Sequence, residues 1–312
     1  MIRKGKADIM SLENKIDFAV VFSVKKANPN GDPLNENRPR VNYDGLGEVS
    51  DVCLKRKLRN RLQDMGEKIF VQSDSNREPG DNYRSLKDRF EHNSAIKAIM
   101  DEQKKSKKLN CEELAEAACK NWYDVRAFGQ VFAFSNGKKK GKSSEDEGAD
   151  SVSIGIRGPV SIQNAVSLMP VDIYSQQITK SVNLETNEKD PGHKGADTIG
   201  MKHRVDYGVY VAFGSINCQL AEKTGFSNKD SDQLLAALKT LFVNDESSAR
   251  PSGSMKVEKV IWWKHNCRSG QYASADVHES LQVKCDGMKK PEVSFKRTFE
   301  GLEPIIFDGE NI

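Results

Sequence analysis

The sequence lacks the cysteine and histidine spacings that mark common metal sites. None of its cysteines forms a Cys-x-x-Cys pair, and no histidine belongs to a His-Glu-x-x-His motif or stands at zinc spacing from a cysteine. We therefore expect no bound metal, and we interpret each of the five histidines as a surface or loop residue. The six cysteines are Cys53, Cys111, Cys119, Cys218, Cys267 and Cys285.

Long apolar runs are also missing. No segment approaches the roughly 18–20 apolar residues that a helix needs to cross a bilayer. The basic residues 1–6 are not followed by the apolar stretch of a signal peptide. We therefore expect a cytoplasmic protein that contacts no membrane and whose thiols stay reduced.

Nucleotide-binding loops are incomplete in this chain. Residues 137–143 resemble a phosphate-binding loop, but three residues separate their glycines where the Walker pattern has four. Residues 45–50 lack the third glycine of the dinucleotide fingerprint. Neither pattern indicates an ATPase or a dinucleotide enzyme, and we expect no cofactor.

The chain has enough apolar material for a core but little net charge. It contains 312 residues, of which 37% are hydrophobic and 30% charged, with a net charge of +3. This length allows about two domains, or one domain with large insertions. Because the whole molecule is not a polycation, a nucleic-acid site would require basic side chains gathered into patches.

The strongest local signal joins a strand, a turn and a basic helix. Residues 16–24 alternate apolar side chains with the period of a strand, and Asn28-Pro-Asn-Gly-Asp-Pro33 has turn chemistry. Ser50 is a helix N-cap, and Gly66 can end the helix. The basic side chains of this helix could be a solvated face, but only one acid accompanies them in residues 51–61, which favours phosphate contact. They are Lys55, Arg56, Lys57, Arg59 and Arg61.

The rest of the chain alternates helical and strand-like patterns without an internal repeat. The order predicts an α+β fold with a ferredoxin-like sheet and two large insertions. Asn110 and Glu113 resemble a capping box within the first insertion. We expect a helical insertion at residues 72–122, strands at 125–134, 152–162, 205–213 and 257–265, an extended excursion at 175–200 and a helix at 230–242.

Three further groups of residues are candidates for chemistry. Met201, followed by Lys202 and Arg204, could be an apolar wedge between bases with cations for phosphates, or an ordinary basic turn before a strand. Arg126 and Phe128 on one strand face could stack on bases, but a core Phe and a salt-bridged Arg are at least as well supported. Asp32 could orient a hydroxyl or water, although turn chemistry explains it better.

These segments together resemble the CRISPR-associated backbone subunit of type I-C Cascade, over about residues 16–215. The resemblance is carried by Ala27-Asn-Pro-Asn-Gly-Asp-Pro33, Val49-Ser-Asp-Val-Cys-Leu-Lys-Arg-Lys-Leu-Arg-Asn60, Asp124-Val-Arg-Ala-Phe-Gly129, Ile156-Arg-Gly-Pro-Val-Ser-Ile-Gln163 and Gly200-Met-Lys-His-Arg-Val-Asp-Tyr-Gly-Val-Tyr210. It implies a single palm domain over 1–312 with a modified RNA-recognition-like sheet, a helical finger at 72–122 and an extended thumb hairpin at 175–204.

The resemblance also implies partners and roles. Copies of the chain would stack head to tail along one CRISPR RNA, and the guide would pair with target DNA. Other Cascade subunits and a helicase-nuclease would join the complex. The RNA-binding residues would be Asn28, Asn30, Lys55, Arg56, Arg59, Arg126, Phe128, Met201, Lys202 and Arg204.

The resemblance leaves some segments and alternatives open. Lysines within 104–108 could touch target DNA, and residues 137–150 have no secure counterpart. One rival is a metal-dependent ribonuclease that uses Asp32. Another is a basic interaction protein that binds no nucleic acid.

Overall fold

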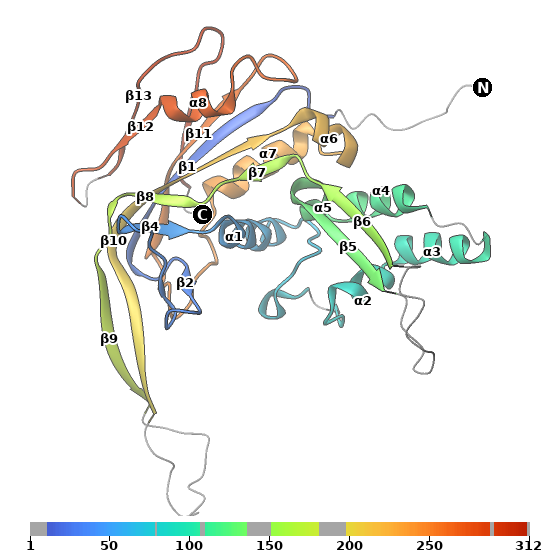
Figure 1. Ribbon diagram of the computed structural model, residues 1–312, viewed down its shortest axis with the longest axis horizontal. Helices are drawn as coiled ribbons and strands as arrows, with labels where there is room; N and C mark the ends of the chain where they lie inside the picture. The colour runs from blue at the N-terminus through green and yellow to red at the C-terminus, as the bar shows by residue number, and fades with distance from the viewer. Residues whose placement is uncertain are drawn as a thin grey trace, which may run out of the picture.

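The computed structural model describes residues 11–78, 80–106, 110–135, 151–180, 198–287 and 290–310. In these ranges an antiparallel sheet of eight strands forms the centre of the molecule, a helical lobe lies beside it, and a two-stranded hairpin projects from it (Figure 1). No helix in the same ranges is long and apolar enough to cross a membrane.

The sheet is built around β1, which pairs antiparallel with β10 on one side and β11 on the other. The path across the sheet is β14-β11-β1-β10-β8-β4, and β7 and β9 also pair with β10. The strands are β1 Ile16–Ala27, β4 Leu46–Val49, β7 Val160–Ile162, β8 Ala165–Pro170, β9 Ile173–Lys180, β10 Thr198–Ile216, β11 Met255–Lys264 and β14 Ile305–Asp308.

The strand predicted over residues 16–24 is confirmed as β1, and both of its faces are buried. Phe18 and Phe22 pack in the larger hydrophobic cluster, where Phe22 stacks on Tyr210 with ring centroids 5.3 Å apart. Ala19 and Val21 point to the opposite face and belong to another cluster. Because successive side chains of a strand point to opposite faces, the register of β1 determines which of its residues enter each of the two hydrophobic clusters.

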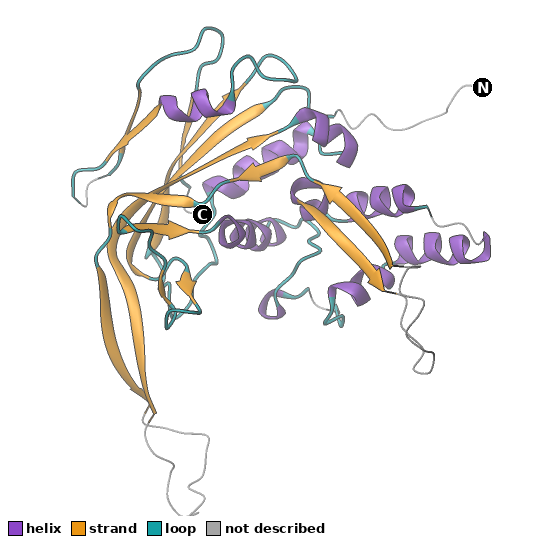
Figure 2. Cartoon of the chain, viewed as in Figure 1, coloured by secondary structure: helices purple, strands orange, loops and turns teal. Residues whose placement is uncertain are grey.

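Three helices, drawn in purple in Figure 2, cover one face of the sheet: α1 Asp51–Asp64, α6 Cys218–Thr224 and α7 Asn228–Lys239. The predicted N-cap of α1 is confirmed, since the Ser50 side chain accepts a hydrogen bond from the Cys53 amide. Leu58, Leu62 and Leu238 are buried against the sheet. Each such side chain contributes about 1.5–3 kcal/mol to stability.

The C-terminal segment covers the opposite face with α8 Ser274–Ser280, β12 Leu281–Lys284 and β13 Glu292–Phe295. The expectation that every histidine lies at the surface or in a loop is wrong for His278, which is buried in α8, and for His203, which is buried in β10. His265 does lie in a loop, directly after β11, but it is buried. His265 is 1% exposed and hydrogen bonds through Nε2 to Asp17 Oδ2 at 2.8 Å. His278 is also buried, and its ring stacks on Phe213.

The helical lobe has a hydrophobic cluster of its own. Phe70 packs on Trp122 with ring centroids 4.7 Å apart, and Phe132 and Ile154 close the same cluster. The cluster therefore extends beyond residues 72–122 in both directions. The lobe contains the 3-10 helix Asp74–Asn76, α2 Leu86–Glu91, α3 Ser94–Ser106, α4 Cys111–Asn121, α5 Tyr123–Phe128, and the paired strands β5 Gly129–Ser135 and β6 Ser151–Arg157.

The capping box expected at Asn110 and Glu113 is only half formed. The Asn110 side chain accepts from the amides of Glu112 and Glu113, as a cap does. The amide of Asn110 donates to Gln103 Oε1 instead of to Glu113, and the Glu113 carboxylate accepts from Gln103 Nε2. The reciprocal partner is therefore Gln103 on α3, which ties α3 to the start of α4.

The strand predicted over residues 125–134 is wrong in its first half, because residues 123–128 form α5. A buried carboxylate holds this turn of helix, since Asp124 accepts from the amides of Phe70 at 2.7 Å and Val71 at 3.0 Å. β5 begins at Gly129, whose φ of +80° and close approach to the Ile156 carbonyl leave no room for a side chain. Arg126 therefore lies on a helix.

Two hairpins lie near each other beside the sheet. β9 pairs with the first part of β10, from Thr198 opposite Lys180 to Val205 opposite Ile173. The short strands β2 Gly31–Asp32 and β3 Arg38–Pro39 form the second hairpin. The predicted thumb is therefore a β-hairpin in its described part, and residues 181–197 lie outside the described ranges.

Candidate nucleic-acid interface

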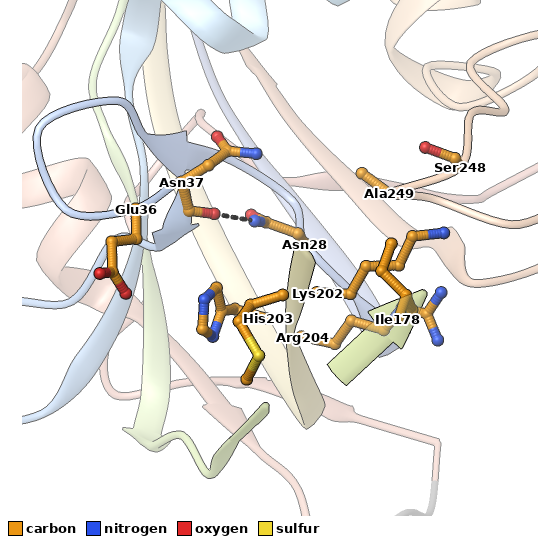
Figure 3. Close-up of a pocket in the computed structure, with 10 residues that line it drawn as sticks. Asn28, Glu36, Asn37, Ile178, Lys202, His203, Arg204, Ser248 and Ala249 are labelled. Atoms are coloured by element: carbon orange, nitrogen blue, oxygen red, sulfur yellow. Dashed lines mark hydrogen bonds between the residues drawn. The ribbon is translucent and has the colours of Figure 1, made fainter. Parts of the chain in front are cut away.

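A cavity of about 220 Å³ lies where the β9–β10 hairpin leaves the sheet. We refer to it as the hairpin-base pocket. It brings together segments that are far apart in the sequence (Figure 3). Its walls are Asn28 after β1, Glu36 and Asn37 in the turn before β3, Ile178 of β9, residues 201–204 of β10, and Ser248 and Ala249.

Asn28 lies in the wall of this pocket and is only 4% exposed. Its main-chain amide donates to the Ala249 carbonyl at 2.9 Å, and its side-chain Nδ2 donates to the Asn37 carbonyl at 2.7 Å. Because a carbonyl can only accept, the amide nitrogen must point toward Asn37. The Asn28 Oδ1 atom is then buried without a partner among the described residues.

Asn30 connects the turn to the basic helix. Its Oδ1 accepts from both the amide and the hydroxyl of Ser50, each at 2.9 Å. Ser50 in turn caps α1, so this asparagine orients the start of the helix toward the turn. Its predicted contact with RNA remains a prediction.

His203 is the other deeply buried polar side chain of the pocket, with 5% of its surface exposed. Its Nδ1 is 2.8 Å from Ser175 Oγ, which also accepts a hydrogen bond from Arg38 at 3.3 Å. The Ser175 hydroxyl has one proton and two acceptor lone pairs, so it can accept from Arg38 and either donate to Nδ1 or accept from it. Nε2 has no partner in the part of the chain that the structure describes.

The three predicted hairpin residues all line the same pocket. Met201 is 50% exposed, and Lys202 and Arg204 are partly buried. The Arg204 Nε atom is buried and unpaired within the described ranges. Two cations and an exposed thioether side chain at a half-open cavity suit a phosphate beside an apolar ring.

The predicted phosphate-binding side chains of α1 each have a partner within the protein. Lys55 pairs with Asp51 at 3.0 Å, and Arg56 donates to the Val71 carbonyl at 2.8 Å. Burial lowers the pKa of Arg56, and neighbouring Arg59 lowers it further. Their contact with RNA therefore requires exchange of these partners or use of the remaining donors.

Arg59 is more enclosed than Lys55, with 14% of its side chain exposed against 23%. Its Nε donates to the buried Asp124 carboxylate at 2.9 Å, and its guanidinium lies 5.2 Å from the centre of the Phe128 ring. The pair joins α1 to the helical lobe. Arg59 and Phe128, both predicted to bind RNA, therefore contact each other, and their contact joins parts of the fold.

The remaining two basic side chains of α1, Lys57 and Arg61, lie inside the protein. Lys57 forms a buried ion pair with Asp245, and Arg61 donates to Thr240 Oγ1 at 2.7 Å. Burial lowers the pKa of Lys57, and Asp245 opposes that shift. The basic run therefore divides between the core and the surface.

Arg126 lies on α5 and not on the face of a strand. It donates to Asp230 Oδ1 at 2.7 Å, contacts Glu67 at 3.6 Å and lies over the Tyr123 ring. Burial acts to lower its pKa, but the hydrogen bond and charge of Asp230, with Glu67, raise it above its ordinary value. This geometry agrees with the alternative that Arg126 is held in a salt bridge and does not stack on a base.

Asp32 is held by its own turn. Its Oδ1 accepts from the Leu34 amide at 3.2 Å and from Arg40 at 3.3 Å. Across the described residues, no group of three or more histidine, cysteine or acidic side chains is close enough to hold a metal ion. The geometry is that of an Asx turn with an ion pair.

Two predicted segments fall largely outside the described residues. Lysines 107 and 108 are not described, and for lysines 104 and 105 only the helical main chain of α3 is described. The whole of 137–150 also lies outside the described ranges. Their roles stay predictions.

Sequence reasoning missed His203, Ser175 and Arg38 as one connected group. The only local signal was the position of His203 between Lys202 and Arg204. The strand period places it on the opposite face from those two cations, together with Ser175 across the hairpin. Its partners come from β3 and β9, which no spacing in the sequence connects.

An antiparallel sheet with a projecting hairpin and a cationic pocket at the hairpin base defines a candidate nucleic-acid-binding protein. The chain belongs to the family described as CRISPR-associated protein Cas7, because the model of that family matches residues 14–300.

Comparison with individual proteins gives similar relatives. A CRISPR-associated protein Cas7 of Haloferax volcanii is 29% identical over 228 residues, which are 72% of this chain and 63% of that protein. This alignment therefore spans less than two thirds of the relative's length.

Two solved structures are also similar. A chain of a CRISPR RNA-guided surveillance complex in a pre-nicking state has a TM-score of 0.41 and 12% identity, over 80% of this chain and 78% of that chain. A chain of another CRISPR RNA-guided surveillance complex has a TM-score of 0.39 and 15% identity, over 80% and 68%.

Proposed function

We propose that this chain is a non-catalytic subunit that binds CRISPR RNA and forms the repeating backbone of a type I-C antiviral surveillance complex. The observation that carries the proposal is the hairpin-base pocket, where Lys202 and Arg204 meet the turn at Asn28. Membership of the Cas7 family supports it. The complex recognises target DNA through the guide, so the protein needs to hold RNA without reading its sequence.

The sheet supports a modified RNA-recognition-like palm. The strand order β11-β1-β10-β8, with α1 following β1 and α7 following β10, is the succession of a ferredoxin-like unit. Both faces of this sheet are covered, by α1 and α7 on one side and by the C-terminal segment on the other. The guide is therefore expected at the hairpin base and the start of α1 and not across the open face of a sheet.

Backbone contacts would carry most of the affinity. Lys55, Arg56 and Arg59 of α1 and Lys202 and Arg204 of β10 are the cations proposed to hold phosphates. Each contact adds a salt-dependent term that does not depend on base identity. The exposed side chain of Met201 is the candidate to contact the bases.

Assembly follows from the same arrangement. Copies that contact one another head to tail through different surfaces form an open filament unless the rotation closes a ring. The projecting hairpin and the helical lobe are the elements proposed to reach neighbouring copies. Other Cascade subunits and a helicase-nuclease would bind the finished particle.

The test is to produce the chain together with a matching CRISPR array, purify it and sequence the RNA that accompanies it. A discrete repeat–spacer RNA in a large particle is the expected result. Random cellular RNA would contradict the guide-specific role. Protein with low absorbance at 260 nm would instead favour an interaction protein that binds no nucleic acid.

The rival ribonuclease gives a separate prediction. We expect no cleavage of guide-paired RNA at regular spacing in the presence of Mg²⁺, because the Asp32 carboxylate is engaged by Leu34 and Arg40. Cleavage that Asp32→Ala abolishes, and that Asp44→Ala on the neighbouring exposed turn leaves intact, would establish the nuclease.

A further inference from the structure

A carboxylate in the segment after α7 is shared by two cations. Asp245 forms an ion pair with Lys57 of α1, and it accepts a hydrogen bond from Arg250 Nε at 2.9 Å. Only 3% of the Lys57 side chain is exposed, against 27% of the Arg250 side chain. The three groups together carry one net positive charge, and Arg250 is the cation through which that charge reaches the surface.

Lys57 needs this carboxylate more than Arg250 does. A buried cation without a partner is strongly destabilising, whereas a partly exposed cation keeps its contact with water. Burial lowers the pKa of Lys57, Asp245 acts to raise it, and the like charge of Arg250 acts to lower it again. An anion beside Arg250 would offset the repulsion between the two cations.

Part of the Arg250 guanidinium remains open to solvent. Its Nε donates to Asp245, both to Oδ2 and, at 3.3 Å, to the main-chain carbonyl. Among the described residues its two terminal nitrogens have no hydrogen-bond partner, and neither is enclosed by the protein. An exposed acid of the same segment, Glu246, accepts from Ser252 and forms no ion pair with Arg250 in the described ranges. A phosphate can therefore bind the outer edge of Arg250 through charge-assisted hydrogen bonds.

Arg250 directly follows two residues of the hairpin-base pocket. Ser248 and Ala249 line that pocket (Figure 3), and the Ala249 carbonyl accepts a hydrogen bond from the Asn28 amide at 2.9 Å. Arg250 is also close to the start of α1, where its charge acts on the Cys53 thiol. Burial raises the pKa of that thiol, and basic neighbours that include Arg250 act to lower it. Arg250 therefore lies beside both places where the guide is expected.

We propose that Arg250 is a further guide-binding residue, which holds one phosphate of the RNA at the edge of the hairpin-base pocket while Asp245 orients its guanidinium. This inference rests on the proposed function and adds a contact that none of the predicted residues supplies. No charge pattern in the sequence indicates it, because Arg250 stands among serine, alanine and proline residues. The contact would be independent of base identity.

Three variants of the full chain separate this role from a structural one. Arg250→Gln removes the charge, but Lys57 still pairs with Asp245, so the protein is expected to remain folded. Arg250→Lys keeps the positive charge. Arg268→Gln is the matched control, because this exposed arginine is paired one to one with Glu222 at 2.6 Å. Affinity for a synthetic guide RNA is measured at several salt concentrations, and circular dichroism verifies that each variant is folded.

Arg250→Gln is expected to reduce the slope of log affinity against log salt by about 0.7, the value for one phosphate of a single strand. Arg250→Lys and Arg268→Gln are expected to keep the wild-type slope. If Arg250→Gln keeps the slope, or if Arg250→Lys or Arg268→Gln reduces it equally, this inference is wrong while the proposed function stands. Loss of folding in Arg250→Gln would also overturn it, because Lys57 alone must then fail to satisfy Asp245. If wild-type protein binds no guide RNA at any salt concentration, the proposed function fails and this inference fails with it.

Discussion

At the scale of single residues, the charged side chains of this protein divide into structural and available groups. Arg61 and Arg126 are held by a hydroxyl and a carboxylate inside the fold, and Arg59, whose remaining donors are proposed to hold phosphate, uses its Nε to bind the buried Asp124. Lys202 and Arg204 line an open cavity. Identical residue types therefore have different expected effects on stability and on binding, and substitutions can separate the two.

Arg59→Ala is expected to lower the free energy of unfolding by about 2–3 kcal/mol, because it leaves the buried Asp124 carboxylate without its cation. The amides of Phe70 and Val71 still satisfy part of that carboxylate. Urea unfolding measures the change. Lys55→Ala, on the same helix but in a partly exposed pair with Asp51, is the control and should cost less than about 1 kcal/mol.

Lys202→Ala is expected to weaken RNA binding and to reduce the slope of log affinity against log salt by about 0.7, the value for one phosphate of a single strand. Binding is measured by titration at several salt concentrations. Lys223→Ala, an exposed lysine on α6, is the matched control. An unchanged slope for Lys202→Ala would remove this residue from the interface.

At the scale of elements, the two faces of the central sheet are covered by segments that are far apart in the sequence. α8 contacts the sheet through His278, whose Nε2 donates to the Gly214 carbonyl at 3.1 Å. Burial lowers the pKa of His278, and Asp17 acts to raise it, with the net result below its ordinary value of 6.5. The folded state therefore favours the neutral ring.

The free energy of unfolding is expected to fall as the pH decreases from 7.5 to below the ordinary histidine pKa. A group whose folded pKa is depressed stabilises the protein above its unfolded pKa, and this stabilisation is lost as protons bind. His278→Gln should flatten the profile, because glutamine can still donate to Gly214 but does not titrate. Urea unfolding at pH 7.5 and 5.5 measures it, with exposed His92→Gln as the control.

The elements predicted from sequence are those set by local chemistry. Ser50 with the apolar spacing of α1 predicts that helix correctly, and the period of two predicts β1. α5 was predicted as a strand because Arg126 and Phe128 alternate, whereas the buried Asp124 that stabilises the helix has partners more than fifty residues away.

The candidate site was predicted only in part, for the same reason. Met201, Lys202 and Arg204 could be found from their chemistry along one strand. Their meeting with Asn28 across the fold, and the surroundings of His203, depend on the register of β10 with β1 and β9. Contacts between distant segments leave no periodic signal in the sequence.

At the scale of the whole molecule, the central sheet, the helical lobe and the hairpin differ in how much of each is buried in a hydrophobic core. The lobe and the sheet each have a buried hydrophobic cluster. The described outer part of the hairpin is largely exposed, including Ile199 and Met201. Changes to the outer hairpin are therefore expected to affect RNA binding with little effect on the stability of the fold.

Replacement of residues 177–201 by an Asn-Gly turn is expected to leave the free energy of unfolding within about 1 kcal/mol of wild type. Gln176 and Lys202 face each other across the hairpin, so a two-residue turn can connect them. The shortened protein should fold but no longer recover guide RNA in a large particle. Size-exclusion chromatography with RNA sequencing measures this, and full recovery of the particle would exclude the hairpin from assembly.

β10 is one unbroken strand of 19 residues that runs from the sheet into the hairpin. Its side chains alternate between two faces, so the direction of His203 is set by the same count of residues that places Val205 in the core. Because Val205 is paired with Ala27 of β1, residues added or removed farther out on the hairpin leave the direction of the side chains at its base unchanged. The reach of the hairpin can therefore change without altering the chemistry at its base.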